Sequence, residues 1–236
     1  MTSGQPSAPL TIPSQRDPLL GVAILGIALV YVRALAFTPI EARQGAAQKI
    51  MYIHATSAFI ALYVAFALMA IASILYLWLK DEKLDRVAES AAEVGLAFTT
   101  VVLLTGPLWG KTIWGAWWTW DARLTSTLFL WFLIVAYSLL RGAVEDRGRR
   151  ARYSAVLGIL AAMLVPFIHL SVYLFRTLHP MPILLKPSAP SMPAEMQVTF
   201  FSAFIAFVLL FAALLRARYR IATLRDLVAS REQERA

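Results

Sequence analysis

Residues 57–79 read SAFIALYVAFALMAIASILYLWL and contain no charged side chain. An α-helix rises about 1.5 Å per residue, so about 20 predominantly apolar residues cross the roughly 30 Å hydrocarbon core of a bilayer. The stretch is long enough for that and predicts a transmembrane helix. The whole chain is 59% hydrophobic and 15% charged, whereas soluble domains contain roughly 45–50% apolar and about 25% charged residues. The composition therefore indicates a membrane protein.

Five other segments are comparable in length and hydrophobicity, or nearly so. The six predicted spans are residues 19–37, 57–79, 91–109, 125–140, 154–175 and 198–215. The fourth is short and is expected to continue into residues 121–124. We predict an all-α polytopic membrane protein with six transmembrane helices in one domain, residues 19–215. Residues 1–18 lack the basic start and apolar stretch of a signal peptide, so a disordered cytoplasmic tail is expected there, and residues 216–236 form a carboxy-terminal tail.

Lysine and arginine are distributed unevenly between the two sides of the predicted membrane. Fifteen of them lie on the side of the amino terminus and six on the other, leaving aside Arg33 within the first span. Because cytoplasmic loops retain positive charge, both termini are predicted to be cytoplasmic and the first, third and fifth loops to face outward. The net charge of +8 reflects this topology. Since no nucleic-acid-binding motif is present, we expect the lipid bilayer, and no nucleic acid, as a partner.

The third loop holds a dense cluster of tryptophans. An interfacial belt is one interpretation, because tryptophan favours the ends of membrane helices, but belt residues are usually spread over several helix ends. Clustered indoles with glycines between them suit a large flat apolar ligand, so we favour a binding platform. Five of the seven tryptophans fall in this loop: Trp109, Trp114, Trp117, Trp118 and Trp120.

Asp121 and Arg123 follow the tryptophans, at a depth where an unpaired carboxylate is costly. Asp121 is expected to cap the fourth helix by accepting hydrogen bonds from its first backbone N–H groups. Proton transfer is the weaker alternative, because no other carboxylate is near in sequence. Arg123 is either an interfacial anchor or a partner for an anionic group of a ligand.

Residues 114–126, WGAWWTWDARLTS, closely resemble the WWD signature of haem-handling membrane proteins. The continuation from Asp121 to Ser126 is similar to the CcmC family, haem exporter protein C of cytochrome c maturation. The six spans, the position of the signature between the third and fourth, and histidines in the flanking outer loops extend the resemblance over nearly the whole chain after residue 18. The resemblance implies a multi-pass protein of the bacterial inner membrane with its haem site facing the periplasm.

The chain has three histidines, two of which are predicted on outer loops. His54 opens the second span and His179 follows the fifth, on either side of the tryptophan loop. An isolated interfacial histidine is usually satisfied by water or a carbonyl group, but neutral imidazole is also a standard axial ligand of haem iron. His169 lies inside the fifth span, where we expect a neighbouring helix to satisfy it, with a supporting role beside the haem as the alternative.

The resemblance implies that His54 and His179 are the axial ligands of haem b and that the tryptophan loop lies against the macrocycle. For the two propionates, Arg123 and Arg176 are preferred among the outer cations, because guanidinium pairs bidentately with carboxylate. Arg176, like Arg123, could instead be an interfacial anchor. The expected haem-contacting residues are His54, His179, Trp114, Trp117, Trp118, Trp120, Asp121, Arg123 and Arg176.

The function that the resemblance implies is the export or presentation of haem at the periplasmic face and its loading onto the haem chaperone CcmE. The implied partners are the transporter subunits CcmA and CcmB and the small membrane protein CcmD. No segment resembles a glycine-rich phosphate loop, so ATP hydrolysis is expected from another subunit. The alternatives are a haem lyase, which without cysteine would rely on positioning haem, and a channel, for which few polar residues besides His169 lie within the spans.

Overall fold

The computed structural model describes residues 17–181 and 192–233. Most of the described chain is helical, and no strand occurs within it. Six helical stretches are long and apolar enough to cross a membrane, which confirms the predicted all-α class with six spans. Most of the tail predicted for residues 1–18 lies outside the described residues. Its last two, Asp17 and Pro18, cap and begin the first helix.

Ten helical elements follow one another in the described chain. The second span consists of η1, α2, η2 and α3 in succession, and the fifth of α6 and α7. The elements are α1 (Pro18–Ala36), η1 (Ala46–Ile50), α2 (Met51–Phe59), η2 (Ile60–Ala65), α3 (Phe66–Leu79), α4 (Glu82–Trp114), α5 (Ala122–Ala143), α6 (Arg147–Ala162), α7 (Leu164–Leu174) and α8 (Ala194–Gln233). The fourth span thus begins at Ala122, as its short predicted segment led us to expect.

Two irregularities interrupt the spans. α6 and α7 are separated at Met163, three residues before Pro166. Proline has no N–H group for the carbonyl four residues earlier, here that of Ala162, and its ring crowds that turn of the helix. The second irregularity is η2, a π-helical segment in the second span. Such segments often occur next to functional sites, and this one carries Tyr63, whose hydroxyl contacts His169 on α7.

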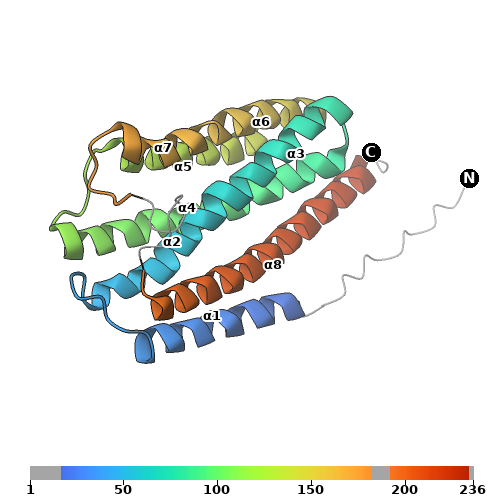
Figure 1. Cartoon of the computed structure of the whole chain (residues 1–236). Coiled ribbons are helices and arrows are strands. Elements are labelled where there is room, and N and C mark those ends of the chain that lie inside the picture. The colour runs from blue at the N-terminus through green and yellow to red at the C-terminus, as the bar shows by residue number, and fades with distance from the viewer. Residues whose placement is uncertain (1–16, 182–191, 234–236) are drawn as a thin grey trace, which may run out of the picture.

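The helices form one bundle, in which α8 packs between α1 on one side and α2 and α4 on the other (Figure 1). α3 packs against α4 and α6, and α5 packs against α4, α6 and α7. Three connections lie at the same end of the bundle, at the left in Figure 1: the loop after α1, the loop between α4 and α5, and the chain that leaves α7. We call this the loop-rich end; it brings together the first, third and fifth loops, which the sequence predicts on one side of the membrane.

Charged side chains of α4, α5 and α8 form an ion-pair network at the opposite end. Arg141 of α5 donates to Asp85 at 2.7 Å and to Glu89 at 3.0 Å, and Arg225 of α8 donates to the same Glu89 at 2.8 Å. Glu89 and Arg141 are only 4% and 8% exposed, so each needs its partners to remain charged there. Because α8 continues without a break beyond residue 215, the network holds its carboxy-terminal part against the bundle.

Candidate functional site

His54 lies on α2 at the loop-rich end, and three positions of α4 surround its ring. Its Nδ1 lies 3.1 Å from the hydroxyl oxygen of Thr105. Gly106 leaves room for the imidazole, because a Cβ atom there would stand 3.1 Å from His54 Cε1. Trp109, one turn after Thr105, packs edge-on against the imidazole with ring centres 5.6 Å apart. One face of α4 therefore sets the orientation of His54.

His179 lies in the chain that follows α7. Its Nδ1 is 3.2 Å from the carbonyl oxygen of Pro180. Because a carbonyl group can only accept, Nδ1 carries the ring proton and Nε2 keeps its lone pair. Burial and the positive charge of Arg123 lower the pKa of His179 to about 3, so the ring is neutral at physiological pH. A neutral imidazole with a free Nε2 is a form that binds a metal ion.

Asp121 connects the tryptophan loop to the chain that carries His179. Its Oδ1 accepts from the backbone N–H of Leu124 at 2.9 Å, which confirms the predicted cap of α5. Its Oδ2 accepts from the hydroxyl groups of Thr119 at 3.2 Å and Thr177 at 2.7 Å. The backbone N–H of His179 donates in turn to Thr177 Oγ1 at 3.0 Å. The carboxylate thus holds two loops of the loop-rich end together, a role that no sequence signal indicated.

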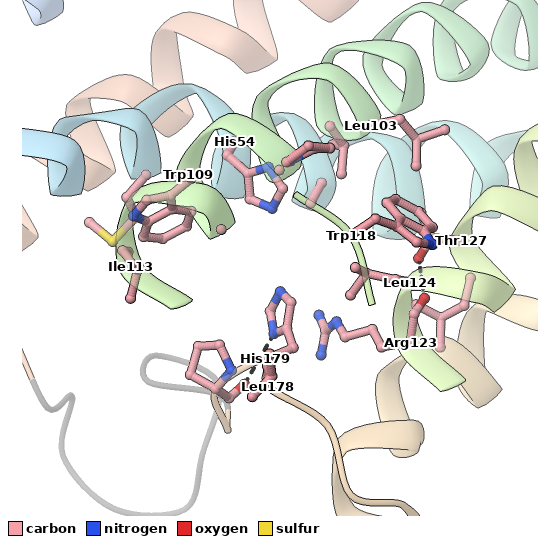
Figure 2. Close-up of a pocket in the computed structure, with 18 of the residues that line it drawn as sticks. His54, Leu103, Trp109, Ile113, Trp118, Arg123, Leu124, Thr127, Leu178 and His179 are labelled. Carbon is pink, nitrogen blue, oxygen red and sulfur yellow. Dashed lines mark hydrogen bonds between the residues drawn. The ribbon is translucent and has the colours of Figure 1, made fainter. Parts of the chain in front are cut away.

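A cavity of about 250 Å³ lies between these residues at the loop-rich end. Figure 2 shows the imidazoles of His54 and His179 on opposite sides of the open space, with the guanidinium of Arg123 beside His179. A smaller cavity of about 130 Å³ adjoins it, shares both histidines and reaches His169. The summed volume of the two cavities lies near the lower end of the roughly 300–1,000 Å³ that ligand sites enclose.

The predicted tryptophan platform divides into two groups. Trp109, Trp114 and Trp118 line the cavity, and the ring of Trp114 lies 6.5 Å from that of His179. Trp117 and Trp120 are 57% and 78% exposed and are not among the described residues that line it. Three of the five indoles are therefore in a position to contact a ligand in the cavity.

Two other predicted residues do not line the larger cavity, and one residue that contacts a lining side chain was not predicted from the sequence. Arg176 is exposed and is not among the described lining residues of either cavity. His169 Nδ1 lies 2.6 Å from the hydroxyl of Tyr63, which confirms that a neighbouring helix satisfies it. Gln44 accepts a hydrogen bond from the indole N–H of Trp109 at 3.2 Å. No sequence signal indicated this contact, because Gln44 belongs to a loop without periodicity or motif.

The fold and the site define the class of this protein: a polytopic helical membrane protein with a cavity between two imidazoles at one end. Comparison with known families makes the assignment specific. The family described as CcmC, Heme exporter protein C, matches residues 3–234. The chain therefore belongs to the CcmC family.

Individual relatives agree with this assignment over most of their length. The Heme exporter protein C of Bradyrhizobium diazoefficiens is 36% identical over 231 residues, which cover 98% of this chain and 88% of the relative. That of Haemophilus influenzae is 35% identical over 207 residues, covering 88% of this chain and 83% of the relative. A ccmC-like mitochondrial protein of Marchantia polymorpha, named for cytochrome c biosynthesis, is 31% identical over 192 residues, 81% of each chain.

Proposed function

We propose that this chain binds haem b as its cargo between His54 and His179. It presents the haem at the periplasmic face of the bacterial inner membrane and passes it to the chaperone CcmE for cytochrome c maturation. The observation that carries the proposal is that the two imidazoles line one cavity from opposite sides. Membership of a family described as Heme exporter protein C supports haem as the cargo.

The chemistry of the lining residues fits haem. An iron porphyrin leaves two axial positions for protein ligands, and imidazole is a standard ligand for them. His54 and His179 supply one imidazole each, and the indoles of Trp114 and Trp118 supply apolar area for a flat macrocycle. Haem supplies the iron when it is bound, while these residues bind it, orient it and exclude water.

Arg123 is the residue best placed to pair with a propionate. Among the described residues it contributes only its backbone carbonyl to hydrogen bonds, with Ser126 and Thr127. Its guanidinium, which borders the cavity, therefore keeps its donors available. Arg176, exposed on the chain that leads to His179, is the candidate for the other propionate.

The proposed partners are those that the resemblance to the CcmC family implies. A sequence without a glycine-rich phosphate loop requires an energy source elsewhere, and CcmA and CcmB, with CcmD, are the proposed complex. Residues of the loop-rich end line the cavity, and a periplasmic acceptor such as CcmE would collect the haem there.

Titration of the detergent-solubilised full chain with hemin, the ferric form of haem b, tests the site. The wild type is expected to give the Soret and visible bands of a low-spin complex with two histidine ligands. His54→Ala and His179→Ala each remove an axial ligand, so the bands should change and the affinity should fall by more than about tenfold.

His169→Ala serves as the comparison, because it also removes an imidazole but one that reaches only the smaller cavity. It should weaken hemin binding less than either outer variant. Spectra and affinities of both outer variants that equal those of the wild type would refute the assignment. Thermal unfolding of each variant without hemin separates a loss of ligation from a loss of folding.

A further inference from the structure

We infer that Thr105 is a positioning residue that sets the tautomer of His54. Its hydroxyl keeps the ring proton on Nδ1 and leaves the lone pair of Nε2 free for the cavity. The role of Nε2 as an iron ligand rests on the proposed function. The tautomer itself is a property of the protein without haem.

The direction of the hydrogen bonds around Thr105 follows from the single proton of its hydroxyl. Thr105 Oγ1 lies 2.7 Å from the carbonyl oxygen of Val101, one turn earlier in α4. Two oxygens this close repel each other unless a proton lies between them, and the carbonyl has none to give. The proton of Thr105 is therefore used in this bond.

In the contact with His54, the hydroxyl oxygen of Thr105 must then be the acceptor and the imidazole the donor. Thr105 Oγ1 lies 3.1 Å from His54 Nδ1 and, with its proton engaged, offers only a lone pair. A hydrogen bond at this distance requires the ring to donate, so Nδ1 carries the proton. In a neutral imidazole with Nδ1 protonated, Nε2 is the unprotonated nitrogen.

Two neighbours on α4 keep the ring in this orientation. Gly106 faces Cε1, the carbon between the two ring nitrogens, so closely that a Cβ atom there would stand 3.1 Å from it, a tight contact. Trp109 packs on the ring edge-on. With Nδ1 held against α4, His54 lines both cavities, and Nε2 is the nitrogen left to bind a ligand.

His179 reaches the same state by a different route. Its Nδ1 donates to the carbonyl oxygen of Pro180, which can only accept. The two imidazoles that line the cavity therefore share one tautomer, although one is set by a side chain and the other by the backbone. Partners on the second ring nitrogen fix the tautomer and raise the basicity of metal-binding histidines. The side-chain partner of His54 can be removed by a substitution, whereas the backbone partner of His179 cannot.

Nitrogen NMR of the full chain in detergent, labelled with ¹⁵N-histidine, tests the tautomer without haem. The chain has three histidines, so His54 can be assigned by the signals lost in His54→Gln. Nδ1 of His54 should be protonated in the wild type and in Thr105→Ser, which keeps the hydroxyl. Thr105→Val should give a mixture of tautomers. A wild-type His54 with its proton on Nε2 would overturn the inference.

Hemin titration and redox titration supply the second readout. Thr105→Val should bind hemin about tenfold more weakly and give the bound haem a higher reduction potential, because an imidazole without an acceptor on Nδ1 is a poorer electron donor. Thr105→Ser should stay close to the wild type. Thr112→Val is the matched control, since it removes a hydroxyl of the same helix that, among the described residues, bonds only to backbone carbonyls.

Equal affinity and equal potential in Thr105→Val and Thr112→Val would overturn the role of Thr105. A wild type that binds no hemin would refute the proposed function instead, and the NMR result would still decide the tautomer. Comparable thermal unfolding of Thr105→Val and Thr105→Ser shows that the difference between them arises from the hydrogen bond and not from misfolding.

Discussion

Trp117 and Trp118 are adjacent in sequence, yet their side chains have different surroundings. Trp118 lines the cavity. Trp117 is 57% exposed, and the ammonium group of Lys111 lies over its ring, with Nζ 6.0 Å from the ring centre. At the scale of single residues, Trp118 therefore lies where a binding platform would require it, and Trp117 lies where an interfacial belt would.

This difference predicts unequal effects of the same substitution. Trp118→Leu keeps the loop apolar but removes an indole face, and an aromatic contact contributes about 0.5–1.5 kcal/mol beyond its buried area. We expect hemin affinity to fall roughly three- to tenfold, while Trp117→Leu changes it little. Spectroscopic titration of purified variants measures both.

Transfer to CcmE provides the corresponding test in membranes. The Trp117→Leu/Trp118→Leu double variant should load less haem onto CcmE, whereas expression stays near that of the wild type. Trp78→Leu is the control, because Trp78 is 79% exposed near the end of α3, away from the cavity. Equal impairment by the double variant and Trp78→Leu would mean that the loop is only an interfacial belt.

At the scale of elements, the close approach of α4 to the second span depends on Gly95. A Cβ atom at Gly95 would stand 2.6 Å from Phe66 Cε1 and 3.0 Å from Ala65 Cβ. Both neighbours are fully buried, so neither can move away freely. Small residues at such crossings allow membrane helices to pack closely.

Gly95→Ala is therefore expected to destabilise the bundle by about 1–3 kcal/mol, the usual cost of overpacking a filled core. Gly158→Ala is a matched control, because the atoms nearest to its added Cβ lie at 3.4 Å, an ordinary contact. Thermal unfolding in detergent should show a lower midpoint for Gly95→Ala only. Identical midpoints for the two variants would contradict the importance of this crossing.

At the scale of the whole molecule, the cavity and the ion-pair network lie at opposite ends of the bundle. The distribution of lysine and arginine predicts which end faces the cytoplasm. Reporter fusions after Arg43 and Lys111 should read out as periplasmic, and those after Lys83, Arg147 and Arg225 as cytoplasmic. A cytoplasmic signal after Lys111 would reverse the orientation and place the cavity on the wrong side for CcmE.

The sequence by itself determined the class, the number of spans and the family, because each depends on a local property. Spans follow from the length of apolar runs, and the cap of α5 follows from an aspartate directly before a helix. His54, His179 and the tryptophan signature were likewise visible as residue types at particular positions. Their common cavity was an expectation from the resemblance alone.

Only the tertiary structure decided which side chains meet. The contacts of His54 with Thr105 and of Thr177 with Asp121 join residues 51 and 56 positions apart. Such contacts depend on how each helix is rotated about its axis. In a membrane the lipid-facing and core-facing sides of a helix are both apolar, so hydrophobic periodicity does not specify that rotation. Packing at small residues such as Gly95 and Gly106 specifies it instead, and that packing exists only in the assembled bundle.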